Sequence, residues 1–276
     1  MSNLQLRIVS ALVLAAVVLA ITWFGGLPFR VLAAVIAVAI FYEWSRMARP
    51  AAGGEWPRGG FGIVADALLL IFAVAIAIGL PALVLLGLAV AVVVLLAAFS
   101  ASRRQDQWAA AGFAYASLSG VSLALLRGGD KAGLIAILFL FAVVWATDIF
   151  AYFVGRAVGG PKLAPAISPG KTQSGALGGM VAGVIAGVLL GLGVGLSNLW
   201  LLALVAALLS VVSQAGDLFE SWVKRRHGVK DSGWIIPGHG GVMDRVDGLV
   251  AAAFTLYLIG WALGDADRPA LGLFAR

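Results

Sequence analysis

The chain contains no cysteine and very little charge. Only 12% of its 276 residues are Asp, Glu, Lys or Arg, whereas 62% are hydrophobic and the mean hydropathy is +1.04. The lack of cysteine excludes disulfides and thiolate metal sites. Water-soluble domains carry about 25% charged residues, so the composition indicates an integral membrane protein. The apolar stretches are long and lack the alternation of barrel strands, which predicts an all-α polytopic membrane protein.

About nine transmembrane helices are expected. No convincing cleavage site separates the first two apolar stretches, so we interpret the first as an uncleaved anchor. We expect an N-terminal region, residues 1–130, with about five spans, and a C-terminal region, residues 131–276, with about four spans and cytoplasmic loops at 156–174 and 219–246. The expected spans are roughly 8–24, 29–44, 61–79, 81–99, 108–126, 134–155, a seventh beginning near 175, 199–218 and 246–263.

The positions of Lys and Arg predict the orientation of these spans. With nine spans, most of the 19 Lys and Arg residues lie on the side that the N-terminus shares with the even-numbered loops. The positive-inside rule places this side in the cytoplasm. The net charge of +6 is therefore attributed to topology signals rather than to nucleic-acid binding.

Carboxylates in and beside the spans gather at the same predicted end. A carboxylate at that depth costs a few kcal/mol unless it is paired or bound to metal, by an estimate of roughly 2.5–3.5 kcal/mol for a helix centre. The pattern predicts a polar cavity that opens to the cytoplasm and is sunk into the inner half of the bilayer. The residues concerned are Asp66, Asp148, Asp217, Asp244 and Asp247.

The stretch 217–247 concentrates charge of both signs. A patch that only held anionic lipids would be basic without the acids, whereas carboxylates can bind a divalent metal while Lys and Arg bind phosphate oxygens. A solvated loop with ordinary surface charges is the alternative. The cations are Lys224, Arg225, Arg226, Lys230 and Arg245, and the carboxylates are Asp217, Glu220, Asp231, Asp244 and Asp247.

Three of these carboxylates are candidate metal ligands. Asp244 and Asp247 are three residues apart and share a helix face if the last span begins there, and Asp217 lies at the end of the preceding span. Together they could supply the oxygen ligands that Mg²⁺ prefers. Ordinary Asp–Arg ion pairs are the alternative.

The nearby cations are candidates for holding phosphate. Lys224, Arg225 and Lys230 could neutralise phosphate oxygens, or could serve only as topology signals. His239 lies among glycines that permit close backbone approach, and could donate to a phosphate or brace the loop.

Two glycine-containing segments precede this stretch. The segment 168–172, Ser-Pro-Gly-Lys-Thr, is not a Walker site, because Pro165 stands where that motif needs glycine. It could hold phosphate through Lys171 and backbone N–H groups, or simply start a helix. The glycines at 175, 179, 183, 187 and 191 would form a ridge against which another helix can pack closely.

With these residues in view, the chain resembles the phosphatidate cytidylyltransferase, or CDP-diacylglycerol synthase, family. Two further segments are similar to the family: Asp148 with Ala151-Tyr152 and Gly155-Arg156, and the segment 168–172. Family members often carry Glu or Gln where this chain has Ser174. The family's C-terminal pattern is met by Ser221, Lys224-Arg225, Lys230-Asp231, Ile236-Pro237, His239-Gly240-Gly241 and Asp244-Arg245-Val246-Asp247.

The resemblance implies a bacterial-type inner-membrane nucleotidyltransferase of phospholipid biosynthesis. It would transfer the cytidylyl group of CTP to phosphatidate, giving CDP-diacylglycerol and pyrophosphate. It also implies Mg²⁺, with a second, monovalent cation left open, and a homodimer in the lipid bilayer with no nucleic-acid partner.

On this basis each candidate residue receives an expected role. A transporter, a CDP-alcohol phosphatidyltransferase and a purely structural membrane protein are the rival interpretations. A transporter would typically have internal repeats and ionisable residues near the midplane, and this sequence shows neither. The Asp-Gly and Ala-Arg pattern of a CDP-alcohol phosphatidyltransferase is not found here, and a purely structural protein would not need the carboxylates. The metal ligands would be Asp217, Asp244, Asp247 and Asp148; the phosphate-binding residues Lys171, Thr172, Ser221, Lys224 and Arg225; and the catalytic residues Lys230, Asp231, His239 and Arg245.

Overall fold

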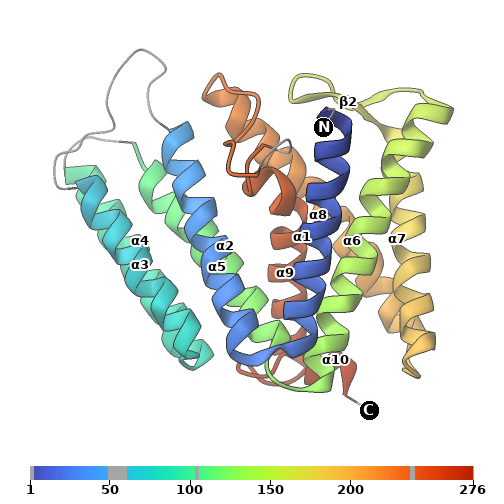
Figure 1. The fold of residues 1–276 in the computed structure, drawn as a ribbon, viewed down its shortest axis with the longest axis horizontal. Helices are drawn as coiled ribbons and strands as arrows, with labels where there is room; N and C mark the ends of the chain where they lie inside the picture. Colours follow the sequence, from blue (N-terminus) through green and yellow to red (C-terminus); the bar gives the residue numbers. More distant parts are fainter. Residues whose placement is uncertain (1–2, 49–60, 103–105, 237–239, 276) are drawn as a thin grey trace.

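The protein is a bundle of long helices with one small hairpin (Figure 1). The computed structural model describes residues 3–48, 61–102, 106–236 and 240–275. The helices are α1 (Asn3–Phe24), α2 (Gly26–Met47), α3 (Phe61–Ile78), α4 (Ala82–Ser102), α5 (Trp108–Arg127), α6 (Lys131–Val158), α7 (Gln173–Gly193), α8 (Leu199–Arg226), α9 (Met243–Leu263) and α10 (Leu271–Phe274), and the strands are β1 (Lys162–Ala164) and β2 (Ser168–Thr172).

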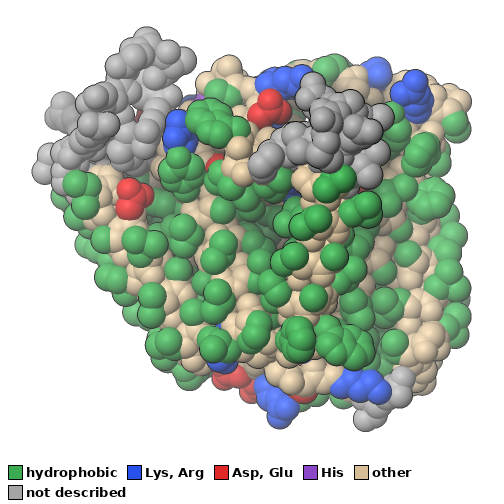
Figure 2. Space-filling model, in the orientation of Figure 1, with side chains coloured by type: hydrophobic (Ala, Val, Ile, Leu, Met, Phe, Trp, Pro, Cys, Tyr) green, Lys and Arg blue, Asp and Glu red, His purple; other side chains and the backbone are tan. Residues whose placement is uncertain are grey.

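The helices confirm an all-α polytopic membrane protein. By length and composition, seven of the described helices can cross a membrane, and two further apolar stretches, Val9–Phe24 and Gly62–Ile78, are shorter. Figure 2 shows hydrophobic side chains over the middle of the visible face, with most charged side chains towards its two ends. This distribution suits a bundle whose waist is surrounded by lipid.

Helix α9 lies inside the bundle and packs against both α5 and α8. On one side, α5 contacts α2 and α4; on the other, α8 contacts α7, which packs along α6. Helices α3 and α4 therefore lie at one edge and α7 at the other, and the N-terminus is at the same end as β2 (Figure 1).

Local sequence explains where several helices begin and end. The side chains of Asp130, Thr172 and Asn198 each accept a hydrogen bond from a backbone N–H in the first turn of α6, α7 and α8, which is the usual N-cap arrangement. Helix α3 stops before Gly79, whose φ of +79° suits glycine, and Pro81 follows two residues later.

The predicted glycine ridge is confirmed, and it packs within the chain. All five of its glycines are buried in α7. A Cβ at Gly179 would lie 2.5 Å from the carbonyl oxygen of Thr147 in α6, and one at Gly187 would lie 3.0 Å from Cβ of Ala206 in α8. The ridge therefore lets α6 and α8 approach α7 at backbone distance.

The two loops that were expected to be cytoplasmic contain regular structure. Helix α8 continues to Arg226, so residues 219–226 are helical rather than part of a loop. The segment 156–174 contains the end of α6 and the antiparallel pair β1–β2. Hydropathy marks where apolar residues end, and a helix can continue beyond that point into polar surroundings.

At the opposite end of the bundle, a buried arginine joins the ends of three helices, α1, α5 and α6. Arg127, at the end of α5, donates through Nε to the carbonyl of Thr22 at 2.5 Å and through its two terminal nitrogens to the carbonyls of Trp23 and Asp130. The bonds to Thr22 and Trp23 satisfy carbonyls in the last turn of α1, where a helix leaves its carbonyls without partners, whereas the carbonyl of Asp130 also accepts from the backbone N–H of Leu134 in α6.

Candidate active site

A cavity of about 890 Å³ opens among α6, α7, α8, α9 and the β1–β2 hairpin. It lies at the end of the bundle where β2 and the α8–α9 connection meet (Figure 1). Its polar and charged lining residues in the described part of the chain are Asp148, Tyr152, Arg156, Lys162, Lys171, Thr172, Gln214, Asp217, Glu220, Lys224, Asp231, Asp244, Arg245 and Asp247.

The continuation of α8 beyond its apolar stretch places three charged residues on one wall. Asp217, Glu220 and Lys224 are spaced three and four residues apart, so they share a face of the helix and all line the cavity. Had the chain left the helix near residue 218, this alignment would have been lost.

Lys224 lies between two carboxylates. Its Nζ is 2.6 Å from Oε2 of Glu220 and 2.7 Å from Oδ1 of Asp244 in α9. The side chain of Lys224 is 13% exposed, that of Glu220 1% and that of Asp244 8%. Because water reaches them so little, this group joins α8 to α9 more strongly than a surface ion pair would.

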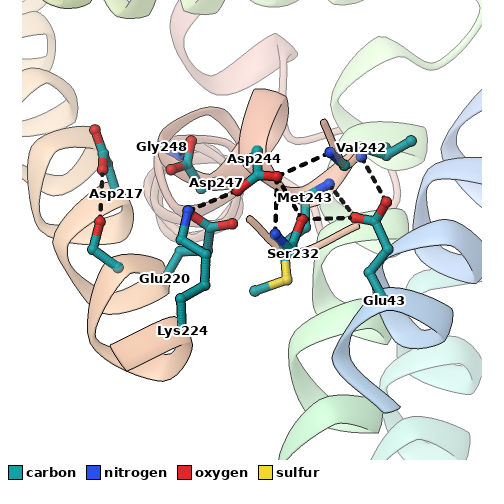
Figure 3. A network of polar contacts seen from close by, with 12 residues as sticks. Glu43, Asp217, Glu220, Lys224, Ser232, Val242, Met243, Asp244, Asp247 and Gly248 are labelled. Carbon is teal, nitrogen blue, oxygen red and sulfur yellow. Dashed lines mark hydrogen bonds and ion pairs between the residues drawn. The ribbon is translucent and has the colours of Figure 1, made fainter. Parts of the chain in front are cut away.

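Both carboxylate oxygens of Asp244 accept hydrogen bonds from the protein (Figure 3). Besides Lys224, it accepts hydrogen bonds from the backbone N–H and the hydroxyl of Ser232 at 3.0 and 2.9 Å, and from the backbone N–H of Gly241 at 2.9 Å. Both oxygens of Asp244 thus have protein partners, so its orientation is fixed by the chain itself.

A second ion pair crosses the cavity from the hairpin to α8. Nζ of Lys171 lies 2.5 Å from Oδ2 of Asp217, and the hydroxyl of Ser221 donates to Oδ1 of the same carboxylate at 3.4 Å. About a third of each charged side chain is exposed, 28% for Lys171 and 34% for Asp217. Both side chains of this pair are therefore more exposed than that of Lys224.

Several carboxylates lie near one another in the cavity. Asp148 and Asp247 both interact electrostatically with Asp217. Among the described residues, no three His, Cys, Asp or Glu side chains are close enough together to bind a metal ion. A metal site made of three protein ligands is therefore not preformed in this part of the chain.

The structure confirms one of the two functions that the sequence of segment 168–172 left open, the start of a helix, whereas phosphate binding stays a prediction. The segment forms strand β2, and Thr172 caps α7 by accepting from the backbone N–H of Gly175 at 3.1 Å. Lys171 meanwhile reaches Asp217 in the cavity. The next residue of interest, Ser174, donates to the carbonyl of Gly159 and so fastens the start of α7 to the end of α6.

Most of the predicted site residues come together, and a few do not. Ser221 contacts Asp217, whereas Arg225 and Lys230 are exposed and are not among the described residues of the lining. Asp66, in α3, is also exposed and outside this lining. His239 lies outside the described residues. Those that line the cavity are Asp148, Lys171, Thr172, Asp217, Lys224, Asp231, Asp244, Arg245 and Asp247.

Sequence reasoning missed two buried carboxylates. Glu220 was counted among the charges of its segment but received no function, and it proves to be the second partner of Lys224. Glu43, at the end of α2, is completely buried and accepts hydrogen bonds from the α8–α9 connection. Its only signal was a carboxylate beside Trp44 at the end of an apolar span.

The family of the chain follows from comparison with known proteins. The family model described as "Cytidylyltransferase family" matches residues 5–263. The chain belongs to the cytidylyltransferase family. This confirms the family expected from the motifs, and the match extends over the N-terminal half, where the sequence offered only a set of spans.

Individual members of the cytidylyltransferase family are similar over all or part of the chain. Phosphatidate cytidylyltransferases of Brucella suis biovar 1 and Brucella melitensis biotype 1 are each 47% identical over 277 residues, covering 100% of both chains. The phosphatidate cytidylyltransferase of Staphylococcus epidermidis is 44% identical over 116 residues, 42% of this chain and 45% of its own.

Proposed function

We propose that this protein transfers the cytidylyl group of CTP to phosphatidate, forming CDP-diacylglycerol and releasing pyrophosphate. The observation that carries this proposal is a cavity lined by lysines and carboxylates at one end of an apolar helix bundle. Two polyanionic substrates need such cations, and a diacyl lipid needs such a location. Membership of the cytidylyltransferase family supports the same reaction.

The chemistry requires positioning more than proton transfer. An oxygen of the phosphatidate phosphate attacks the α-phosphorus of CTP, and the bond from that phosphorus to the bridging oxygen of the β-phosphate breaks. A phosphate monoester is largely dianionic near neutral pH, because its second pKa is about 6, so no strong general base is required. The protein's task is to hold two anions together and to stabilise charge in the transition state.

The cavity is lined by five Lys and Arg residues in the described part of the chain. Lys171 and Lys224 lie in the wall formed by β2 and α8, while Arg156, Lys162 and Arg245 also line the cavity. We assign phosphate binding to Lys171 first, because it is the more accessible of the two lysines that are held in ion pairs. An arginine can grip a phosphate with two parallel N–H bonds, which suits Arg156 and Arg245 for the same task.

Mg²⁺ fits this cavity as an ion shared with the nucleotide. Mg²⁺ is commonly held by one or two carboxylates together with substrate phosphates and water, so a preformed cluster of three ligands is not needed. We propose that one or two of Asp217, Asp148 and Asp247 would hold it. Asp244, whose oxygens already have partners, is better suited to orient Lys224. When bound, Mg²⁺ would neutralise charge developing on the triphosphate.

The location of the cavity also suits a lipid substrate. Moving phosphatidate out of the bilayer would cost about 0.8 kcal/mol for each exposed CH₂ group, so the nucleotide must come to the membrane. We propose nine membrane spans, with α1 and α3 completing the set, and an orientation with the cavity, the N-terminus and most Lys and Arg on the cytoplasmic side of the inner membrane. A homodimer remains part of the proposal.

The proposal is tested by turnover of the purified protein in detergent. Phosphatidate and CTP labelled in the cytidine are supplied with and without Mg²⁺, and label in the lipid phase and free pyrophosphate are measured. We expect Mg²⁺-dependent transfer, and a loss of about 100-fold or more in Asp217→Asn, in line with removing one group that stabilises a charged transition state. A folded protein that transfers no label would contradict the reaction. Arg268→Gln, in a salt bridge with Asp130 at the other end of the bundle, serves as control.

A further inference from the structure

Glu43 presents its carboxylate to the α8–α9 connection and to the first residues of α9. It comes from α2, in the half of the chain that contributes no residue to the described lining of the cavity. The carboxylate accepts hydrogen bonds from the backbone N–H groups of Val242 and Met243 at 2.9 and 2.8 Å, and from the hydroxyl of Ser232 at 3.1 Å (Figure 3). Its side chain is completely buried.

This contact takes the place of a helix cap. Helix α9 begins at Met243, and the preceding residue, Val242, has no side chain that can accept a hydrogen bond. The first N–H groups of a helix have no partner inside the helix and carry partial positive charge. A carboxylate from another helix therefore satisfies them and stabilises the start of α9, just before Asp244 and Asp247.

The connection is shaped to receive this carboxylate. A Cβ at Gly233 would lie 2.6 Å from Oε1 of Glu43, and a Cβ at Gly241 would lie 2.6 Å from Oε2. Both distances are too short for any side chain larger than hydrogen. These two glycines therefore leave room for the Glu43 carboxylate and, at Gly241, also for the hydroxyl of Ser232.

A continuous set of bonds runs from Glu43 to the cavity. The hydroxyl of Ser232 lies within hydrogen-bonding distance of both Glu43 and Asp244, at 3.1 and 2.9 Å. Asp244 in turn binds Lys224, which lines the cavity. The position of Glu43 is itself fixed, because the neighbouring Trp44 is buried and its indole N–H donates to the carbonyl of Trp108 in α5 at 2.9 Å.

We propose that Glu43 is a positioning residue for the transferase reaction, acting through Ser232 and Asp244 to set the orientation of Lys224 and of the start of α9. This inference rests on the proposed function. It assigns the N-terminal half a direct part in the site: α2 determines the geometry of residues that α8 and α9 supply.

The experiment compares Glu43→Gln with the wild-type protein. The amide has nearly the same size, but its NH₂ group faces a backbone N–H donor, so at least one of the two bonds to α9 is lost. We expect kcat to fall by about 10- to 100-fold, the order of effect that a displacement of about 1 Å produces, with a smaller change in the KM for CTP. Activity is measured per folded protein, well below the melting temperature.

Three further variants test the same path. Ser232→Ala removes the hydroxyl between the two carboxylates and is expected to lower kcat in the same direction. In the double variant Glu43→Gln/Ser232→Ala, kcat should be close to that of the more impaired single variant, because both substitutions break one path. Gly233→Ala, which pushes against Glu43 from the other side, should also lower kcat.

Arg127→Met is the matched control, since Arg127 is a buried charged residue that also joins helix ends, at the opposite end of the bundle. It should lower the melting temperature and leave kcat unchanged. The proposal is overturned if folded Glu43→Gln or Ser232→Ala retains kcat within twofold of wild type, or if the two effects multiply in the double variant. A wild-type protein that transfers no cytidylyl group would instead refute the proposed function.

Discussion

Replacing Lys224 with methionine should destabilise the protein more than any other single loss of charge in the cavity. Lys224 is 13% exposed and is the cation between Glu220, 1% exposed, and Asp244, 8% exposed. Removing it leaves two carboxylates with little access to water. Removing one partner of a buried ion pair costs about 3–5 kcal/mol.

The melting temperature measures this effect. For a chain of this size each kcal/mol corresponds to about 2–4 °C, so Lys224→Met should lower the melting temperature in detergent by on the order of 10 °C. Intrinsic fluorescence can follow the transition, since the chain contains nine tryptophans. Lys230→Met provides the control, because Lys230 is exposed and a surface substitution changes stability by about 0.5 kcal/mol or less.

A compensating substitution separates charge from packing. Adding Glu220→Gln to Lys224→Met removes one of the two stranded charges, so the double variant should recover a large part of the lost melting temperature. If Lys224→Met melted within about 2 °C of wild type, or if Glu220→Gln lowered its stability further, the account of Lys224 as the cation that balances these carboxylates would be wrong.

Three other predictions concern packing, capping and the metal. Gly179→Ala should destabilise by about 1–3 kcal/mol, because its Cβ would meet the carbonyl oxygen of Thr147 at 2.5 Å; Gly193→Ala, with open space around it, should not, and equal melting temperatures would count against the ridge. Thr172→Ala removes the cap of α7 and should cost about 1 kcal/mol, whereas Thr172→Ser should restore most of it; a serine variant as unstable as the alanine variant would argue against capping. Chelating Mg²⁺ should abolish label transfer without unfolding the protein, and adding Mg²⁺ back should restore it; transfer that persists in excess chelator would contradict the metal proposal.

The sequence predicted the helices well, because long apolar stretches leave few alternatives. Each expected span coincides with a helix, and the glycine ridge was placed on the correct helix with the correct consequence. The motif residues were also informative: Lys171 and Asp217 are 46 positions apart in the chain, yet they meet in one cavity. Charged residues at the same expected depth were a sound guide to a shared site.

Depth alone could not say which helices face one another. Asp66 lies at the expected end of its span, but α3 is near the edge of the bundle and its carboxylate does not line the cavity. The polar end of α8 was missed for a related reason: its residues stop being apolar before they stop being helical. Glu43 could not be assigned at all, because its partners are backbone N–H groups nearly 200 positions away, and these leave no trace in the sequence.

The ion pair between Lys171 and Asp217 affects how charged substrates can enter a polar cavity at the end of an apolar helix bundle. Each group serves as the other's counter-ion, so neither charge is left without a partner. If the proposed complex of Mg²⁺ with the nucleotide bound here, the carboxylate would be able to turn to the metal and the ammonium to a phosphate. Lys171 and Asp217 would then exchange each other for groups of the ligand, and each charge would keep a counter-ion. This exchange of ion-pair partners would avoid the large desolvation cost of bringing a polyanion without counter-ions into the membrane.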